Sequence, residues 1–288
     1  MTHRHLAQQR GGLTFHCVFW SNRQMLEPRS IAVAQNLLRA LRFFGQARNT
    51  GEIRDIPGVS LIFCGLNYAA FNAALVAEPI DSDPRALDRV IEVSSKQFDS
   101  RNVRWTCWVC DAFLGPSLRR DAGRIFSRHG LRGLTDAPGM YAERLVPPRR
   151  GLPPLEVEAV NDDRTRGAFA QIMSVAFDIP YSVCLAIYGA ERAWMGELRG
   201  YVGFVNQRPV TTAAAIITGD VIGLYSVATV PECRRLGYAE AIMRKVVEQA
   251  GHSSGIERTV LQATQSGLSL YKRMGYQTVT NFNVYIAD

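Results

Sequence analysis

The segment from Val227 to Met243 constrains the fold of this 288-residue chain more than any other. It opens with an apolar, β-branched run that is typical of a buried strand. Pro231 ends the strand, a short basic loop follows, and an amphipathic helix begins near Gly237. A loop that opens into a helix N-terminus presents unpaired backbone N–H groups and the positive end of the helix dipole. The segment therefore predicts a site for a phosphate or pyrophosphate, which the small residues Gly237 and Ala239 let approach the main chain.

Other phosphate-binding loops have different spacings. A dinucleotide site needs Gly-x-Gly-x-x-Gly early in a βαβ unit with an acidic residue further on, and a mononucleotide site needs Gly-Lys-Ser or Gly-Lys-Thr. Neither spacing exists in this segment. An ordinary strand–turn–helix that carries a surface pair of arginines stays open as the plain structural alternative.

The segment resembles the acyl-CoA-binding motif of the GNAT superfamily of N-acyltransferases. That motif reads Arg or Gln, two residues, Gly, one residue, then Gly or Ala, and Arg234, Gly237 and Ala239 fill it here. The resemblance implies that the strand's main chain pairs with the pantetheine arm of acetyl-CoA and that the loop holds the pyrophosphate. The residues so implied are Val227, Ala228, Thr229, Arg234, Arg235, Leu236, Gly237, Tyr238, Ala239 and Glu240.

A second motif follows at about the distance that the GNAT family has. Residues 258–263 indicate another buried strand, and residues 266–274 indicate a short helix that carries Leu270-Tyr271 and is closed by Gly275-Tyr276. The resemblance covers roughly residues 155–288. It implies an α/β (α+β) GNAT fold, in which helices flank a mixed, mostly antiparallel central sheet.

Tyr271 is the residue that the resemblance assigns to catalysis. The tyrosine of the family's Leu-Tyr motif protonates the departing thiolate, and a phenol is a suitable acid for a leaving group whose own pKa is about 8.5. The family often has an asparagine seven residues earlier, on the pantetheine arm. Thr264 stands there in this chain, so we expect that contact to be weaker or to come from a hydroxyl.

The general base is not identified by the sequence. Many GNAT enzymes carry a carboxylate on the strand before the CoA loop, but residues 221–229 contain none, and Asp220 lies only at the start. Glu197, Tyr225 or Ser226 could act through a water molecule, or the amine could arrive already neutral. Three aromatic residues in the segment that usually covers the acceptor site are more typical of core or lid packing: Tyr181, Tyr188 and Trp194.

Two Pro-Pro pairs around a glycine predict a domain boundary at residues 147–154. After it we predict a strand, two helices, three strands, a helix, a strand, a helix and a final strand, so residues 155–288 form the GNAT domain. Its predicted core contains Val157, Phe169, Ile172, Val202, Ala214, Ile216, Leu224, Val227, Ile242, Val246, Leu261 and Leu270.

Residues 1–146 are predicted to form a separate α/β lobe. Helical patterns cover residues 31–44, 83–98 and 118–129, a strand covers 104–110, and residues 61–75 mix both signals. This order of elements is similar to that of the second half, but residues 1–146 contain no phosphate-binding loop. We expect a degenerate GNAT-like half that holds no CoA, and an unrelated α/β domain is the alternative.

Composition narrows the class of protein. Apolar residues make up 47% and charged residues 20%, which is ordinary for a globular chain. Residues 1–150 hold 21 Lys+Arg against 13 Asp+Glu, but these cations are dispersed, which argues against nucleic acid as a partner. An acidic substrate or partner on the first half stays open. The dominance of Arg over Lys suggests a GC-rich bacterial genome.

Metal, redox and membrane functions are not indicated. The six cysteines are scattered, and the one close pair, Cys107 and Cys110, lacks the second pair that a zinc ribbon needs. No run approaches the roughly 18 apolar residues of a spanning helix. The N-terminus shows no secretory signal, so the expected location is the cytoplasm. A homodimer is compatible with the sequence.

The sequence therefore favours an acetyl-CoA-dependent N-acetyltransferase that acts by direct transfer on a primary amine of a small molecule or a peptide. The alternative is a non-catalytic acyl-CoA sensor or partner-binding module. An intact Tyr271 favours the enzyme, and the missing carboxylate favours the sensor.

Overall fold

The computed structural model describes residues 27–81 and 83–287 of the chain. Its strands form one sheet of eleven strands in the order β1-β2-β3-β4-β11-β5-β10-β9-β8-β7-β6. Only β3–β4 and β9–β10 are parallel among the paired strands, so the predicted mixed and mostly antiparallel sheet is confirmed. No helix in the described ranges combines the length and the apolar character needed to cross a bilayer.

The second half follows the predicted order of elements. Its hairpin turns at Asn206 and Gln207, whose φ angles of 49° and 63° suit the tight turn between two twisted strands. The capping box that Asp162 and Thr165 form starts the first helix. The elements are β6 (Glu156–Ala159), α4 (Asp163–Phe177), α5 (Tyr181–Tyr188), η3 (Glu191–Met195), β7 (Arg199–Val205), β8 (Arg208–Thr218), β9 (Val221–Thr229), η4 (Pro231–Cys233), α6 (Tyr238–Ser254), β10 (Thr259–Gln262), α7 (Leu268–Arg273) and β11 (Gln277–Ala287).

The first half contains the predicted helices and strand, together with strands that the sequence pattern did not predict: β1, β2, β3 and β5. Residues 61–75, with their mixed signals, hold the end of one strand, a 3₁₀ turn and most of another. The elements are α1 (Pro28–Gln46), β1 (Glu52–Ile56), β2 (Val59–Phe63), η1 (Ala69–Phe71), β3 (Ala73–Val76), α2 (Pro84–Asp99), β4 (Thr106–Cys110), η2 (Asp111–Phe113), α3 (Pro116–Arg128) and β5 (Leu131–Ala142).

The two halves exchange their last strands. Read from either edge, the sheet shows an antiparallel run, then a parallel pair joined through a helix, then a strand from the other half. Strand β11 pairs with β4 of the first half, β5 pairs with β10 of the second, and β5 and β11 pair with each other at the centre. The division into domains at 1–146 and 155–288, with the irregular residues 147–154 between, stays a prediction from the sequence.

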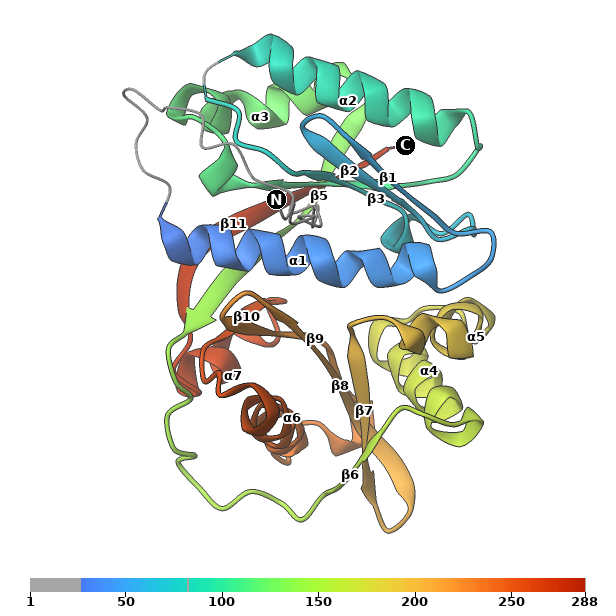
Figure 1. Ribbon diagram of the computed structural model, residues 1–288, viewed down its shortest axis with the longest axis vertical. Coiled ribbons are helices and arrows are strands. Elements are labelled where there is room, and N and C mark those ends of the chain that lie inside the picture. The colour runs from blue at the N-terminus through green and yellow to red at the C-terminus, as the bar shows by residue number, and fades with distance from the viewer. Residues whose placement is uncertain (1–26, 82, 288) are drawn as a thin grey trace, which may run out of the picture.

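Helix α1 lies across the middle of the molecule, with α2 and α3 on one side of it and α4 to α7 on the other (Figure 1). Two sets of its side chains enter different cores. Leu37 and Leu41 belong to the cluster of the first half, and Ala40 and Phe43 belong to the cluster around α4 and α5. The helix therefore serves both halves, although its sequence lies in the first.

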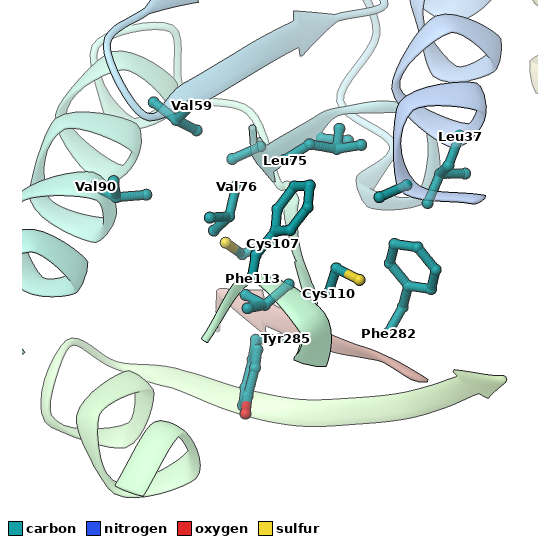
Figure 2. Packing of buried hydrophobic residues seen from close by; sticks show 14 of the residues in the cluster. Leu37, Val59, Leu75, Val76, Val90, Cys107, Cys110, Phe113, Phe282 and Tyr285 are labelled. Carbon is teal, nitrogen blue, oxygen red and sulfur yellow. The ribbon is translucent and has the colours of Figure 1, made fainter. Parts of the chain in front are cut away.

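The core of the first half closes around the exchanged strand. Phe282 and Tyr285 of β11 pack among Val76, Cys107 and Phe113 (Figure 2). Phe126 of α3 stacks on Tyr285 with 3.8 Å between ring centroids. Burial raises the pKa of the Cys107 thiol to about 12, and Cys110 is also buried, so these thiols are inert packing groups.

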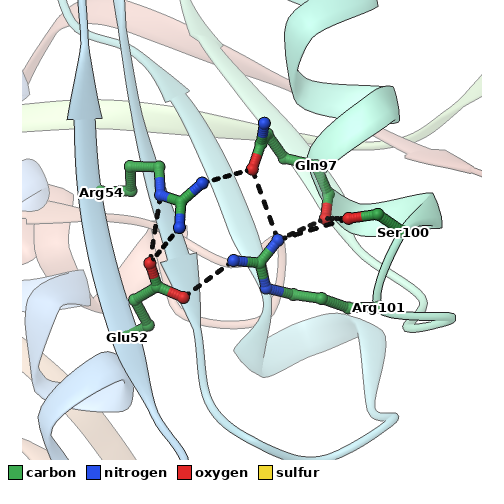
Figure 3. A network of polar contacts seen from close by, with 5 residues as sticks. All are labelled: Glu52, Arg54, Gln97, Ser100 and Arg101. Atoms are coloured by element: carbon green, nitrogen blue, oxygen red, sulfur yellow. Dashed lines mark hydrogen bonds and ion pairs between the residues drawn. The ribbon is translucent and has the colours of Figure 1, made fainter.

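A polar network joins β1 to the end of α2 (Figure 3). Glu52 accepts hydrogen bonds from Arg101 at 2.8 Å and from Arg54 at 2.6 Å, and these bonds lower the pKa of its carboxyl. Arg54 also donates to Gln97 at 2.6 Å. The network holds the outermost hairpin against the helix that covers it.

The predicted core of the second half is confirmed in large part. Nine of the twelve predicted core residues are buried. The other three, Val157, Val227 and Leu270, are partly buried and pack against the cluster that contains Leu224 and Ile242.

We expect Phe126→Ala to destabilise both halves together, because the ring packs on a strand that belongs by sequence to the other half. Its side chain is fully buried, so the loss should be roughly 3–5 kcal/mol. Calorimetry should show one unfolding transition at a lower temperature. Leu134→Ala, at a residue of β5 that is 48% exposed, is the control and should change stability by about 0.5 kcal/mol or less. Two transitions, with only one of them shifted, would contradict the coupling.

Candidate functional site

The sheet opens between β9 and β10. These parallel strands pair only at Thr259 with Ile222 and at Val260 with Gly223. Beyond that point the edge of β9 that faces β10, from Leu224 onward, has no strand partner in the described part of the chain. An irregularity in the pairing with β8 lies at the same place, where Ser226 takes a φ of 49°. The bulge bends β9 away from its neighbour and leaves backbone groups available for a ligand.

The loop after β9 ends in an uncapped helix. Gly237 is the N-cap of α6 with a φ of 96°, and no side chain bonds to the first N–H groups of the helix. Arg235 also takes a positive φ, of 64°, so the loop turns its main chain sharply before the helix begins. Leu236 is 55% exposed at the tip. Unpaired N–H groups and an exposed tip make this loop a suitable anion cradle.

Side chains on both sides hold the loop in shape. Arg234 donates to the carbonyl oxygens of Thr229 and Ala176, both at 3.2 Å, so its guanidinium ties the loop to the end of α4. Glu240 pairs with Arg244 at 2.8 Å, one turn along the helix. These two predicted binding residues therefore have their side chains engaged within the protein.

The connector between the halves lies over the same loop. Arg150 donates to the carbonyl of Arg235 at 3.3 Å, and a Cβ at Gly237 would lie 3.1 Å from Pro153. An arginine of the connector thus stands beside the uncapped helix end, where it would add positive charge. The Pro-Pro pairs of residues 147–154 predicted a linker, and nothing in their pattern predicted this contact.

Tyr271 is buried in α7 beside Tyr276, with 6.0 Å between ring centroids. Its hydroxyl has no hydrogen-bond partner among the described residues, and burial raises its pKa to about 12. The phenol therefore keeps its proton through the physiological range. Gly267 makes room for the ring, since a Cβ there would lie 2.6 Å from Cε2 and 3.0 Å from the hydroxyl oxygen.

A cavity of about 440 Å³ extends from the opening in the sheet. Val227, Thr264 and Tyr271 line it together, so three predicted site residues from three elements meet at one place. Thr264 also uses its hydroxyl to accept a bond from the Gly267 N–H at 3.3 Å, at the start of α7. The other predicted binding residues lie outside the cavity lining, on β9, on the loop after it and in the first turn of α6.

Of the four candidates for a general base, two line the cavity and two lie away from it. Tyr225 and Ser226 line the cavity, whereas Glu197 is 62% exposed elsewhere and pairs with Arg39 at 3.6 Å. Asp220 pairs with Arg258 at the far end of β9. No carboxylate lies among the described lining residues.

The aromatic residues 181, 188 and 194 take different places. Tyr188 is fully buried and lines the cavity, and Trp194 donates to its carbonyl at 2.8 Å within the core. Tyr181 is 48% exposed at the start of α5.

The first half supplies much of the cavity wall. Residues of α1, η1 and β4 take part, among them Phe44, Tyr68 and Trp108. These residues were not predicted, because no local signal in the sequence links the first half to this site. The exchanged strands and the central position of α1 bring them there.

The corresponding opening in the first half is closed. Strands β3 and β4 pair over residues 73–75, and the seam continues through Ile80, which bonds to Phe113 at 2.7 Å and to Gly115 at 2.9 Å. The next helix, α2, is already capped by the carboxylate of Asp83. A phosphate would meet a negative group there instead of free N–H groups.

One family model matches the second half of the chain. Residues 159–276 match the family model of the acetyltransferase (GNAT) family. None of the curated proteins matches the sequence. Among solved structures, a GCN5-related N-acetyltransferase from Kribbella flavida is 18% identical with a TM-score of 0.67, over 90% of this chain and 95% of that one.

Two further structures share the fold over most of the chain. A GCN5-related N-acetyltransferase from Sphaerobacter thermophilus is 17% identical with a TM-score of 0.54, over 90% of this chain and 92% of the other. A tandem GNAT protein from the clavulanic acid biosynthesis pathway is 11% identical with a TM-score of 0.51, over 88% and 94%. At these identities the likeness concerns the fold.

We expect Gly267→Ala to displace the Tyr271 ring, because the added Cβ has no room beside it. Crowding of this kind costs about 1–3 kcal/mol, so the melting temperature should fall and the near-ultraviolet circular dichroism of the tyrosines should change. Gly167→Ala in α4 is the control, since a Cβ there meets nothing within 4 Å. Equal melting temperatures and spectra for both variants would show that Gly267 has no such role.

Proposed function

Because residues 159–276 match the model of the acetyltransferase (GNAT) family, we propose that this protein transfers an acetyl group from acetyl-CoA directly to a primary amine. Acyl transfer in general follows from the family. The acetyl donor and the amine acceptor are our proposal, with a small molecule or a peptide as the carrier of the amine and the cytoplasm as the location.

The observation that carries the proposal is the meeting of Tyr271 with the open edge of β9 in one cavity. The uncapped N-terminus of α6 lies at the end of the same strand, after the loop. A pyrophosphate on the loop and an extended pantetheine arm along β9 would bring a thioester to the cavity. These are the groups that acyl transfer from CoA requires.

The residues have distinct roles in this reaction. N–H groups at the start of α6 would bind the pyrophosphate, and the free edge of β9 around Val227 would align the pantetheine and polarise the thioester carbonyl. The amine nitrogen attacks the carbonyl carbon, and the C–S bond then breaks. Tyr271 donates its proton to the departing sulfur, and the nitrogen loses a proton in turn, which restores the phenol.

Direct transfer places few chemical demands on the protein, because positioning of the thioester and the amine accounts for most of the chemistry. A phenol whose pKa is about 12 is protonated at all working pH values. It can therefore act as the acid on a thiolate whose ordinary pKa is about 8.5.

We infer one CoA site for each chain. The sealed seam at Ile80 and the carboxylate cap at Asp83 support this, since they close the equivalent position in the first half. The first half would then serve as a wall of the acceptor cavity and not as a second catalytic unit.

We expect acetyl-CoA to bind with one molecule for each chain and with help from Arg150. Arg150→Ala should raise the Kd for acetyl-CoA about fivefold or more, because a charge-assisted hydrogen bond to a phosphate contributes about 1 kcal/mol or more. The salt dependence of binding should also weaken. Arg149→Ala is the matched control, since this exposed neighbour makes no hydrogen bond to the loop among the described residues. Calorimetric titration that finds two molecules for each chain, or equal effects of both variants, would contradict this.

We expect Tyr271→Phe to lower kcat by about 10²–10⁴ while acetyl-CoA binding and the melting temperature barely change. The substitution keeps the ring in place and removes only the proton. Release of free thiol from acetyl-CoA in the presence of an amine measures the rate. Tyr276→Phe, at the neighbouring buried tyrosine outside the cavity lining, should keep the wild-type rate. Wild-type kcat for Tyr271→Phe, where chemistry limits the rate, would remove the assignment. If the protein binds acetyl-CoA but releases no thiol from it with any amine, a sensor would instead be favoured.

A further inference from the structure

The cavity beside Tyr271 is apolar and uncharged. Its wall comes from both halves of the chain, with Leu37, Leu41 and Phe44 on one side and Met173 and Phe177 on the other. Among the described residues that line it, none is an aspartate, glutamate, histidine, lysine or arginine. A cationic amine would have to leave water for this environment without a counter-ion, which is strongly unfavourable.

Two polar side chains of the cavity make hydrogen bonds within the protein. Tyr225 donates its only proton to Asn36 Oδ1 at 2.6 Å, and Asn36 is fully buried. Thr264 is engaged at the start of α7 with Ser266 and Gly267. These groups therefore offer little to an incoming ligand.

Gln262, like Tyr271, keeps a polar atom without a partner among the described residues. Its Nε2 donates to the carbonyl of Val33 at 3.4 Å, but its Oε1 is buried and has no partner in the described part of the chain. The side chain lies at the cavity, on the strand next to β9. A buried carbonyl oxygen without a donor is costly, and a ligand N–H would satisfy it. Because an amide oxygen carries no net charge, it suits a neutral amine better than an ammonium group.

We propose that the acceptor is an arylamine or a similarly weakly basic, apolar amine that is uncharged at neutral pH, with Gln262 Oε1 accepting an N–H from its nitrogen. This inference rests on the proposed function and names its substrate class. The missing carboxylate is then no defect, because an amine that arrives neutral needs no base before it attacks.

The acceptor nitrogen forms a bond to the thioester carbon with its own lone pair, and the C–S bond pair leaves on sulfur. Sulfur takes the Tyr271 proton, and the nitrogen releases one N–H proton to the phenolate. Amide and free thiol are the products, and no other reactant is consumed.

The first experiment compares 4-ethylaniline, cyclohexylamine and spermidine as ligands of the full chain in the presence of CoA, by calorimetry at pH 7. We expect 4-ethylaniline to bind at least tenfold more tightly than the two amines that are cationic at this pH. Tighter binding of either cationic amine would overturn the proposal. This readout does not depend on turnover.

The second experiment exchanges the amide for a carboxylate of the same shape. Gln262→Glu should shift kcat/KM at least tenfold towards cyclohexylamine relative to 4-ethylaniline, because the new charge balances the ammonium group. Gln277→Glu makes the same change at an exposed position of β11 and should leave the ratio unchanged. An unchanged ratio for Gln262→Glu would overturn the role of Gln262.

The pH profile gives a third test. The titratable groups that line the cavity are Tyr68, Tyr188, Tyr225 and Tyr271, and burial raises the pKa of each above its ordinary value. Behind them, burial raises the pKa of Cys184 to about 11, and Asp178 lies near Tyr68. We therefore expect kcat/KM for 4-ethylaniline to stay level between pH 6.5 and 9. An inflection in that range would reveal a general base and overturn the proposal.

The outcomes separate this inference from the proposed function. Thiol release with spermidine but not with 4-ethylaniline would overturn the inference and leave the acetyltransferase intact. A higher rate with octanoyl-CoA than with acetyl-CoA would assign the cavity to the acyl chain instead, which also overturns it. Absence of thiol release with every amine would reject the proposed function and the inference with it.

Discussion

The antiparallel pair of β5 and β11 is the contact on which the rest of the molecule depends. Each strand belongs to one half by sequence and to the other by pairing. Their hydrogen bonds join two similar sets of strands, here called arrays, into one continuous sheet. Their side chains contribute to the core of the first half and to the core beneath α6 in the second. This pairing fixes how the halves sit against each other, so that α1 can lie over both and the first half can form part of a cavity beside β9.

The two arrays then differ at one equivalent place. Both contain a parallel pair joined through a helix, yet β9 and β10 separate after two paired positions, while β3 and β4 are joined again at Ile80. A bulge at Ser226 with an uncapped helix accompanies the open pair, and a carboxylate cap accompanies the closed one. Small local choices of turn and cap therefore decide which array can hold a ligand, although the topology is shared.

Local sequence signals predicted what local physics determines. The strand Val221–Thr229 lies where the apolar run before the loop predicts it, and α6 begins directly after Gly237 as expected. Strand β5 was missed because Gly133, Pro138 and Gly139 interrupt its pattern like turn residues. Its exchange between halves, and with it the wall formed by Phe44 and Trp108, depends on contacts far apart in sequence. No single segment carries a sign of such contacts.

The exchange of final strands also bears on how the chain is made. A ribosome releases the first half before the second, and a domain usually folds as it emerges. Here the edge of β4 pairs with residues 282–286, which are synthesised only after the whole of the second half up to β11. We expect the nascent first half to keep an open strand edge until β11 has been made. Its α3 and β5 cannot reach their final surroundings earlier, so the maturation of the first half is tied to the arrival of β11.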